Sequence, residues 1–183
     1  DEVYCHWRGS LKWFNKAKVV RVTGTPIRKD ILYSQRCRSA EKFGLSSSKK
    51  TILVTGGSQG AQAINEVILR CLPKLEPLSS ELQIIHCTGE YGYEAAKAAY
   101  KQTDINAFVC SFLDDMGAAF SMTDIIICRA GATTIAEITA IGIPAILIPY
   151  PHAADNHQYW NAMELASNGG GYLLQQIDLT PEK

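Results

Sequence analysis

The chain has 183 residues, 46% of them hydrophobic, which fits one globular α/β domain with a sizeable core. Its 18 lysines and arginines balance 18 aspartates and glutamates, so it has no global positive field to attract nucleic acid, and we expect no nucleic-acid partner. No apolar run reaches the roughly 18 residues of a membrane span, and no signal-peptide pattern is present. We therefore expect no membrane span and a cytosolic location.

The six cysteines are spread along the chain, with no C-x-x-C pair and no zinc-type spacing. They are Cys5, Cys37, Cys71, Cys87, Cys110 and Cys128. Several lie in apolar runs, where a free thiol behaves as a small buried hydrophobe. This distribution favours a reducing compartment over a disulfide scaffold.

Both ends of the sequence have the character of cut ends. Residues 1–18 start without methionine and carry several aromatic side chains with no clear period. Thr180-Pro181-Glu182 has the pattern of an N-cap, a proline at the first helical position and an acidic first turn, so we expect a helix to begin there. The chain is interpreted as a piece of a longer protein.

Beyond residue 18, short apolar runs alternate with helical stretches, a pattern typical of a parallel sheet. The expected strands are Val19–Thr23, Thr51–Thr55, Gln83–Cys87, Ala107–Cys110, Asp124–Cys128, Ala145–Ile148 and Gly171–Leu174. The expected helices are one that follows Gly60, with apolar residues spaced by three and four, and Tyr91–Lys101, Asp114–Phe120, Thr133–Ile141 and Asn156–Ser167. Residues 38–50 are expected to be a polar connection.

These elements predict a Rossmann-like α/β fold, a parallel sheet with helices on both faces. In such doubly wound sheets, ligands bind beyond the carboxyl ends of the strands. The loops after Thr55, Cys110, Cys128 and Ile148 are therefore the expected places for a binding site.

The first loop, Gly56-Gly57-Ser58-Gln59-Gly60-Ala61, joins a strand to an amphipathic helix. Glycines let the backbone approach a ligand closely, and a helix N-terminus offers free amides and a positive dipole end. The Ser58 hydroxyl can add a hydrogen bond to a phosphate. The loop matches neither Walker A nor G-x-G-x-x-G, and a tight turn whose glycines only relieve steric strain is an equally good interpretation.

The second loop, Arg129–Thr134, leads into a helix that contains Glu137. Thr134-x-x-Glu137 matches a capping box, so the carboxylate can simply bind the first amides of its own helix. In a functional interpretation, Glu137 accepts hydrogen bonds from two neighbouring ribose hydroxyls. From this segment alone, the cap is favoured.

The third segment, Pro149–Ala162, opens with prolines that end the preceding strand and stiffen the loop. Asp155 is a natural N-cap and forms a capping box with Gln158. His157, Gln158 and Asn161 are polar side chains on the first turn of the expected helix, where hydrogen bonds can read a sugar. His157 and Gln158 lie about 100° apart on the helix, so one ligand need not touch both.

Two shorter features add candidates. Arg28 follows the turn at Thr23–Ile27 and can act as a phosphate-binding fork, although a solvated arginine is the commoner outcome. Phe112 and Leu113 follow an expected strand and can flank a base, although such a pair more often belongs to the core.

Five segments occur in a fixed order: T-G-T-P-I-R, G-G-S-Q-G-A, S-F-L-D-D-M, C-R-A-G-A-T-T-I-A-E and H-x-x-D-N-H-Q-Y-W-N-A. Together they resemble the C-terminal domain of the MurG family, over about Ala17 to Pro181. The resemblance implies the C-terminal half of a GT-B glycosyltransferase, with residues 1–16 as a remnant of the N-terminal acceptor domain and 17–183 as the donor-binding domain. It implies an inverting transfer of N-acetylglucosamine (GlcNAc) from UDP-GlcNAc to lipid-linked MurNAc-pentapeptide, which converts lipid I to lipid II in peptidoglycan synthesis.

The resemblance also implies roles for individual residues. The donor site would consist of Arg28, Ser58, Gln59, Phe112, Leu113, Arg129, Gly131, Ala132, Thr133, Thr134, Glu137, His157, Gln158 and Asn161. Arg28 and Ser58 would contact the diphosphate, which the amides of the Gly131–Thr134 loop would also approach. Glu137 would hold the ribose.

The base and the sugar would have their own contacts. Leu113, with Phe112, would line the uracil pocket, and the backbone near Leu113 would meet the base edge. Gln158, alone or with His157, would contact the GlcNAc hydroxyls. Some family members carry glutamine in place of His157, so which of the two reads the sugar stays open. Thr25 replaces the asparagine of many members in a turn where the change matters little.

An inverting transfer needs a base for the acceptor hydroxyl and stabilisation of the charge that grows on the departing diphosphate. Arg28 and two helix N-termini can supply the second. The N-terminal domain would supply the base, the lipid-linked acceptor site and the membrane-facing surface. We therefore expect no catalytic residue in this chain, and a full-length protein that is peripheral on the inner face of the cell membrane. Without an Asp-x-Asp cluster, we expect neither a metal nor a cofactor in the donor site.

Two other functions remain open on the sequence alone. One is a UDP-GlcNAc epimerase or hydrolase on the same scaffold, which would need acid and base carboxylates that the sequence does not place. The other is the donor-binding subunit of a split GlcNAc transferase that works with a separate acceptor-binding protein. The length suits this second function, and the cut ends argue against it.

Overall fold

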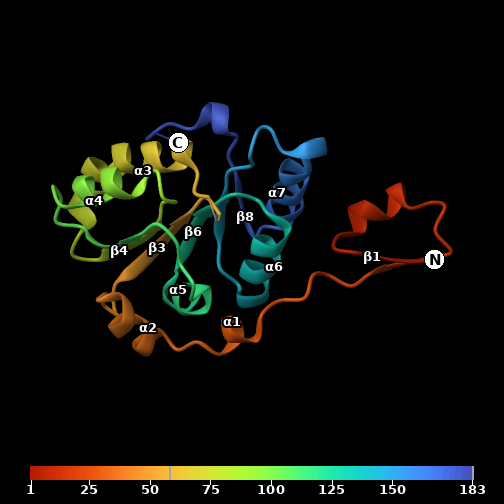
Figure 1. Ribbon diagram of the computed structural model, residues 1–183, viewed down its shortest axis with the longest axis horizontal. Helices are drawn as coiled ribbons and strands as arrows, with labels where there is room; N and C mark the ends of the chain where they lie inside the picture. Colours follow the sequence, from red (N-terminus) through yellow and green to blue (C-terminus); the bar gives the residue numbers. More distant parts are fainter. Residues whose placement is uncertain (58, 183) are drawn as a thin grey trace.

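Six of the expected apolar runs form one parallel sheet in the computed structural model, which describes residues 1–57 and 59–182. The strands are β3 (Lys50–Thr55), β4 (Leu82–Cys87), β5 (Asn106–Cys110), β6 (Ile125–Cys128), β7 (Ala145–Leu147) and β8 (Gly171–Leu173). Each strand ends within one residue of its expected bounds. Figure 1 shows helices on both sides of this sheet, so the predicted α/β fold is confirmed.

The sheet is buried on both faces. Successive side chains of a strand point to opposite sides, so each strand contributes to both cores. In β3, Leu53 packs into the core on one face and Val54 into the core on the other. In β4, Ile85 and Ile84 divide in the same way. Burial on both faces explains why these strands are continuous apolar runs in the sequence.

Two layers of helices cover the two faces of the sheet. On the Leu53 face lie α1 (Lys29–Tyr33), α2 (Arg36–Phe43), α5 (Met116–Met122), α6 (Ala132–Ile141) and α7 (His157–Ser167). On the Val54 face lie α3 (Gln62–Leu75) and α4 (Tyr93–Tyr100). Short 3₁₀ helices η2 (Glu76–Leu78), η3 (Ala154–Asn156) and η4 (Gln176–Asp178) occur in the connections.

The expectation of a polar connection over residues 38–50 is wrong in its first part, which α2 occupies. The helix buries Ala40 and Phe43, three residues apart, in the core. Gly44 ends it in the left-handed conformation, with φ of 63°, as is common for a C-terminal glycine. Charged residues dominate the segment and hide this narrow apolar stripe in the sequence.

The order of strands in the sheet is β5-β4-β3-β6-β7-β8. Along the chain, β4 and β5 are therefore added on one side of β3, and β6, β7 and β8 are then added on its other side. The helix after β3 covers one face and the helix after β6 covers the opposite face. The two connections diverge and leave a crevice at the carboxyl ends of β3 and β6, where doubly wound sheets bind ligands.

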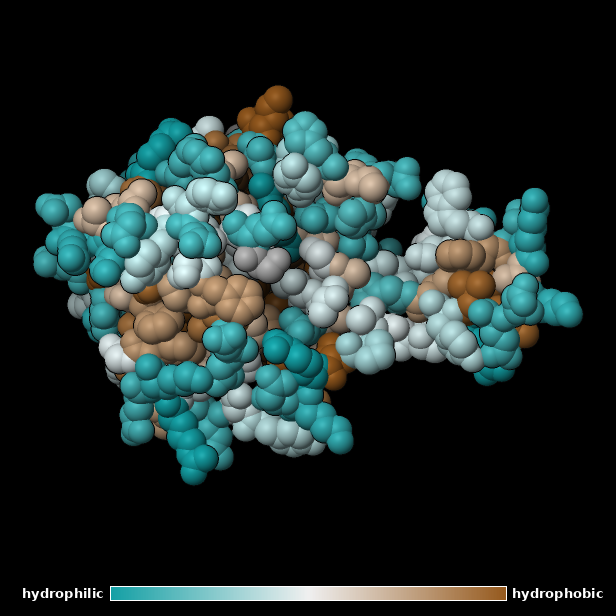
Figure 2. All heavy atoms as spheres, viewed as in Figure 1, coloured by the Kyte–Doolittle hydropathy of each residue, from teal (hydrophilic) through white to brown (hydrophobic). Residues whose placement is uncertain are grey.

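The N-terminal segment forms a separate lobe, visible at the side of the main body (Figures 1 and 2). β1 (Glu2–Cys5) pairs in parallel with β2 (Val19–Val22), and the 3₁₀ helix η1 (Arg8–Trp13) lies between them. The strand expected at residues 19–23 therefore forms, but outside the main sheet, and its partner β1 was not anticipated. The lobe contacts the sheet domain where Trp7 Nε1 donates a hydrogen bond to Asn161 Oδ1 at 3.1 Å.

At the C-terminal end, the Glu182 amide donates a hydrogen bond to Thr180 Oγ1 at 3.4 Å, as expected of an N-cap, and the helix expected to follow stays a prediction. Pro181 and Glu182 lie in a turn, and no helix begins there within the described residues. Lys74 of α3 donates hydrogen bonds to the Pro181 carbonyl (3.3 Å) and the Glu182 carboxylate (2.9 Å), which hold the end against the sheet domain. The expected domain boundary after residue 16 stays a prediction.

A buried polar network connects the two helices on the Val54 face to a loop at the carboxyl edge of the sheet. His86 of β4 is fully buried between Tyr100 of α4, at 3.1 Å, and Asn65 of α3, at 3.0 Å. Asn65 Nδ2 donates to the Thr88 carbonyl at 2.8 Å. Because Asn65 Oδ1 can only accept, His86 Nε2 carries the proton, and the neutral imidazole satisfies both partners. Burial lowers the pKa of His86 to about 4.

We predict that His86 makes the protein less stable in mild acid. An unfolded histidine titrates near 6.5, so between that pH and about 4 the unfolded chain binds a proton that the folded chain excludes. His86 should therefore cost up to about 1.4 kcal/mol of unfolding free energy per pH unit as the pH falls through this range, with no further loss below it. Urea unfolding should show that His86→Gln destabilises the protein more at pH 7 than at pH 5. His152→Gln, at an exposed histidine, is the control. An equal deficit for His86→Gln at both pH values would contradict the prediction.

Candidate functional site

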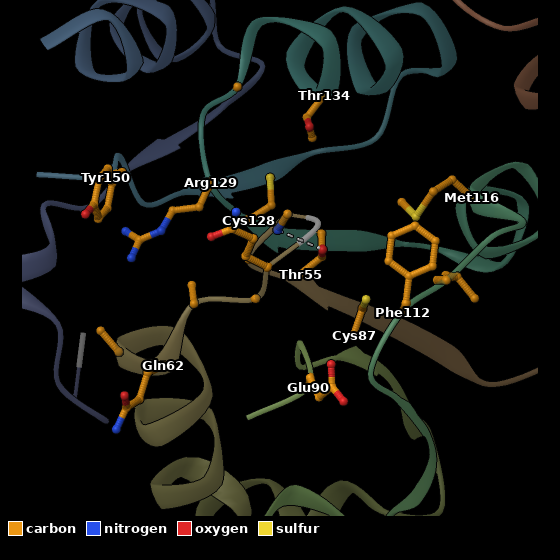
Figure 3. A pocket seen from close by; sticks show the side chains of 18 of the residues that line it. Thr55, Gln62, Cys87, Glu90, Phe112, Met116, Cys128, Arg129, Thr134 and Tyr150 are labelled. Carbon is orange, nitrogen blue, oxygen red and sulfur yellow. Dashed lines mark hydrogen bonds between the residues drawn. The ribbon is translucent and has the colours of Figure 1, made fainter. Parts of the chain in front are cut away.

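An open cavity of 1590 Å³ lies at the carboxyl edge of the sheet, over the crevice between β3 and β6. Thr55, Cys87 and Cys128 stand at the strand ends that form its floor. Figure 3 shows Phe112 and Met116 on one side of these residues and Arg129 and Tyr150 on the other. The loops after β3, β5, β6 and β7, which the sequence singled out, all contribute to the lining.

The glycine-rich loop after β3 borders this cavity and leads into α3, whose first residues Gln62 and Ala63 also line it. Its glycines are required by packing. A Cβ on Gly60, where φ is +75°, would lie 2.1 Å from the Thr88 carbonyl oxygen, and a Cβ on Gly56 would meet the Ala61 amide at 2.2 Å. The steric interpretation of these glycines is therefore correct, and it coexists with a position at the cavity. Ser58 lies outside the described residues, whereas Gln59 lines the cavity.

A fifth loop, after β4, was missed by the sequence analysis. Glu90 and Tyr91 line the cavity from this loop. It packs directly on the glycine-rich loop, since a Cβ on Gly89 would lie 2.4 Å from the Gln59 carbonyl oxygen. The sequence did carry a signal, because Thr88-Gly89-Glu90-Tyr91-Gly92 follows a strand and leads into a helix, as the glycine-rich loop does, but its two glycines are not adjacent as Gly56 and Gly57 are.

The capping-box interpretation of Glu137 is wrong. Helix α6 begins at Ala132 with Gly131 as its N-cap and no side-chain cap bond, so Glu137 lies beyond the first turn. Its carboxylate is buried and lies 3.7 Å from Nε of the half-exposed Arg28. Burial raises the pKa of the Glu137 carboxyl, and Arg28 opposes that rise. Both side chains line the cavity, which thus brings together one cation and one anion from distant parts of the chain.

Arg129 connects its own loop to two other segments around the cavity. Its Nη1 donates to the carbonyl oxygens of Ile148 (3.1 Å) and Pro149 (3.2 Å), and its Nη2 donates to Gln176 Oε1 (2.7 Å). The guanidinium also lies over the Tyr150 ring, 5.5 Å from its centre. Arg129 therefore lines the cavity while it holds the loop after β7 and η4 in place.

The expected capping box between Asp155 and Gln158 does not form. Asp155 and Asn156 both adopt left-handed backbone conformations, with φ of 49° and 54°, and α7 begins at His157 without a side-chain cap. Aspartate and asparagine tolerate this conformation better than other residues with a Cβ. Gln158 Oε1 instead accepts from the Tyr150 amide at 2.9 Å, and Gln158 lines the cavity.

The other two polar residues of this helix start face elsewhere. The exposed His157 donates from Nδ1 to the Ala154 carbonyl at 2.8 Å and is not among the lining residues. Asn161 accepts from Trp7 and donates from Nδ2 to the Ala130 carbonyl at 3.1 Å. Of the three candidates, Gln158 is therefore the one placed to meet a ligand in this cavity.

Among the candidates named from the sequence, the cavity brings together Arg28, Gln59, Phe112, Leu113, Arg129, Gly131, Thr134, Glu137 and Gln158. Ala132 and Thr133 are exposed at the start of α6 and are not among the lining residues. Phe112 is exposed, and Leu113 packs against the core while it also lines the cavity. In the described part of the chain, no group of three or more His, Cys, Asp or Glu side chains is placed to hold a metal ion. No helix found in that part is long and apolar enough to cross a membrane.

Residues 51–183 match the glycosyltransferase family 28 C-terminal domain. The chain belongs to this family. It is 43% identical over its whole length to the UDP-N-acetylglucosamine--N-acetylmuramyl-(pentapeptide) pyrophosphoryl-undecaprenol N-acetylglucosamine transferase of Geobacter sp. (strain M21), covering 48% of that protein. It is 44% identical over its whole length to the protein of the same name from Syntrophus aciditrophicus, covering 49%. The chain thus spans about half the length of the curated relatives that it matches.

Solved structures give the same picture of the fold. The crystal structure of Acinetobacter baumannii MurG matches with a TM-score of 0.72 and 34% identity over 93% of this chain and 46% of that chain. The glycotransferase of kitacinnamycin matches with a TM-score of 0.66 over 90% of this chain and 39% of that one, and at 16% identity it supports the fold alone. The expected C-terminal half of a GT-B glycosyltransferase is confirmed.

We predict that Gly60→Ala is much more destabilising than Gly57→Ala. Both glycines have positive φ, which costs a residue with a Cβ about 1–2 kcal/mol. Only Gly60 also lacks room, because its Cβ would meet the Thr88 carbonyl, whereas a Cβ on Gly57 has no atom within 4 Å. Urea unfolding should give a loss of roughly 3 kcal/mol or more for Gly60→Ala and about 1–2 kcal/mol for Gly57→Ala. Equal losses would show that the two loops do not pack as described.

Proposed function

We propose that this chain is the UDP-GlcNAc donor-binding domain of an inverting GlcNAc transferase that converts lipid I to lipid II in peptidoglycan synthesis. The observation that carries the proposal is the cavity at the β3–β6 crevice, which brings Arg28, Glu137 and Gln158 together in a family 28 domain. The relatives and the A. baumannii protein named above support the choice of nucleotide sugar and acceptor.

The chemistry of the lining fits a nucleotide diphosphate sugar. Arg28 supplies a half-exposed guanidinium for the diphosphate. The N-terminus of α3 borders the same cavity, and its amides and dipole also favour anions. The Glu137 carboxylate can accept hydrogen bonds from both ribose hydroxyls. Phe112 and Leu113 offer an apolar surface to the uracil ring.

The sugar is assigned to Gln158. It reaches the cavity from the start of α7, and the bond to the Tyr150 amide fixes its Oε1. Its Nε2 can then donate to a GlcNAc hydroxyl. His157 bonds to Ala154, and Asn161 bonds to Trp7 and Ala130. We propose that these two residues shape this region and do not contact the sugar.

In the reaction, this domain stabilises the leaving group. Negative charge builds on the β-phosphate as the glycosidic bond to UDP breaks, and the role proposed for Arg28 and the amides at the starts of α3 and α6 is to stabilise this charge. The second half of the enzyme would bind the lipid-linked acceptor, provide the base for its hydroxyl and place the protein on the inner face of the cell membrane as a peripheral enzyme. The complete site would lie between the two halves.

We predict that Glu137→Gln weakens UDP binding by tenfold or more, which corresponds to about 1.4 kcal/mol. Gln keeps the shape of the side chain but loses the charge that strengthens hydrogen bonds from the ribose. The melting temperature should not fall, because a buried carboxylate is removed together with its desolvation cost. Calorimetric titration with UDP tests this, with Glu94→Gln, at an exposed glutamate of α4, as the control. Unchanged affinity with a lower melting point would assign Glu137 a structural role only.

We also predict that the chain binds UDP-GlcNAc weakly and transfers no GlcNAc by itself. Closure of a second domain normally adds contacts and excludes water. Adding the N-terminal half of a relative, fused or in trans, should produce transfer to a lipid I analogue with inversion at the anomeric carbon. An assay with isotope-labelled donor, with and without that half, measures both. Turnover of UDP-GlcNAc by the chain alone would favour an epimerase or hydrolase, and failure of the folded chain to bind any uridine nucleotide would refute the donor-domain proposal.

A further inference from the structure

The side chain of Asn65 connects the start of α3 to the loop after β4. Asn65 is the fourth residue of α3 and is buried, outside the set of side chains that line the cavity. Its Nδ2 donates a hydrogen bond to the carbonyl oxygen of Thr88 at 2.8 Å. The helix has Ala61 as its N-cap, with no side-chain cap bond, so its first amides can bind an anion. A buried amide thus holds in place the helix start at which the proposed function puts the diphosphate.

Asn65 can take only one orientation in this network. His86 Nε2 lies 3.0 Å from Asn65 Oδ1, and His86 Nδ1 lies 3.1 Å from the Tyr100 hydroxyl. If the amide of Asn65 were turned around, its oxygen would face the Thr88 carbonyl oxygen, and two acceptors would meet. Each group therefore donates to the next, in the order Tyr100, His86, Asn65 and Thr88. All four residues are buried, so these bonds are shielded from water.

The Thr88 carbonyl lies where the loops after β3 and β4 touch. A Cβ on Gly60 would lie 2.1 Å from this oxygen, and a Cβ on Gly89 would lie 2.4 Å from the Gln59 carbonyl oxygen. On the other side, the Thr88 amide donates to the Cys110 carbonyl at 2.9 Å, which ties it to the end of β5. The backbones of the two loops are therefore in direct contact, and the position of Thr88 sets the position of the glycine-rich loop.

We propose that Asn65 is a positioning residue for the diphosphate of the nucleotide, which it does not itself touch. By holding the Thr88 carbonyl, Asn65 keeps the loop after β4 against Gly60 and so directs the amides at the start of α3 into the cavity. The inference rests on the proposed function, which assigns the diphosphate to these amides. It goes further by giving a role to the buried chain from Tyr100 to Thr88, whose four side chains are not among the described residues that line the cavity.

Loss of this contact should affect one part of the ligand. Without Asn65 Nδ2, the buried Thr88 carbonyl loses its donor from α3, and the loop after β4 can move away from the glycine-rich loop. The proposed contacts of the base with Phe112 and Leu113, and of the ribose with Glu137, come from the loop after β5 and from α6. These contacts remain, so the nucleoside should bind as before while the diphosphate binds less well.

The test compares Asn65→Ala with Tyr100→Phe in the full chain. Both remove a bond from the same buried network, but Tyr100→Phe leaves the bond between Asn65 and Thr88 intact. Calorimetric titration with UDP and NMR titration with uridine measure the affinity for the nucleotide and for its nucleoside. Asn65→Ala should weaken UDP binding by about tenfold or more and uridine binding by less than about twofold. Tyr100→Phe should change neither affinity by more than about twofold.

Gly92→Ala tests the same bond without changing Asn65. Gly92 has φ of −91°, which alanine adopts without strain, but a Cβ there would lie 2.3 Å from Asn65 Nδ2 and displace this amide from Thr88. This variant should reproduce the selective loss of UDP affinity. It also keeps the proposal testable if Asn65→Ala does not fold.

Three results would overturn the positioning role. Equal losses of UDP and uridine affinity in Asn65→Ala and Gly92→Ala would show a general loosening of the site. The same loss of UDP affinity in Tyr100→Phe would show that any damage to the network has this effect. Unchanged UDP binding in Asn65→Ala and Gly92→Ala would show that the bond to Thr88 is not needed. If the parent chain binds no UDP, the proposed function itself fails, and the inference fails with it.

Discussion

The whole site depends on one constraint of parallel sheets, which is that every strand ends at the same edge. Strands β3 and β6 are neighbours, but the helices that follow them pack on opposite faces. Their loops therefore separate and leave a space above the ends of these strands. Thr55 and Cys128 close the bottom of this crevice with small side chains, and the glycine-rich loop forms one wall. A cavity at this place follows from connectivity before any ligand-binding side chain is considered.

The walls of the cavity are stiffened by contacts that have no need of a ligand. Gly60 and Gly89 let two loops pack backbone to backbone, and Asn65 ties the second loop to the buried histidine of β4. Arg129 binds the loop after β7 and η4 in the same manner. Such bonds lower the entropy that binding would otherwise have to remove. They also explain why several polar residues near the cavity support its shape and are not free to contact a ligand.

The ion pair of Arg28 and Glu137 is both a contact within the fold and part of the proposed binding site. A carboxylate buried in α6 would be costly without a partner, and the arginine that compensates it comes from the start of α1, far away in the sequence. In the proposed function, the diphosphate takes Arg28 and the ribose takes Glu137, so each group already faces the cavity when the ligand arrives.

The sequence alone determined the six strands of the sheet, the loops at their carboxyl ends and nine of the 25 residues that line the cavity, because apolar periodicity and glycine position act over a few residues. Its capping-box interpretations of Glu137 and Gln158 are wrong, since a capping box is recognised from a few neighbouring residues but the start of a helix is set by how the helix packs. It also missed α2, the pairing of β1 with β2, and the loop after β4. Only the tertiary structure could decide these features, because they depend on contacts such as Arg28 with Glu137 and Gly60 with Thr88 between residues far apart in the chain.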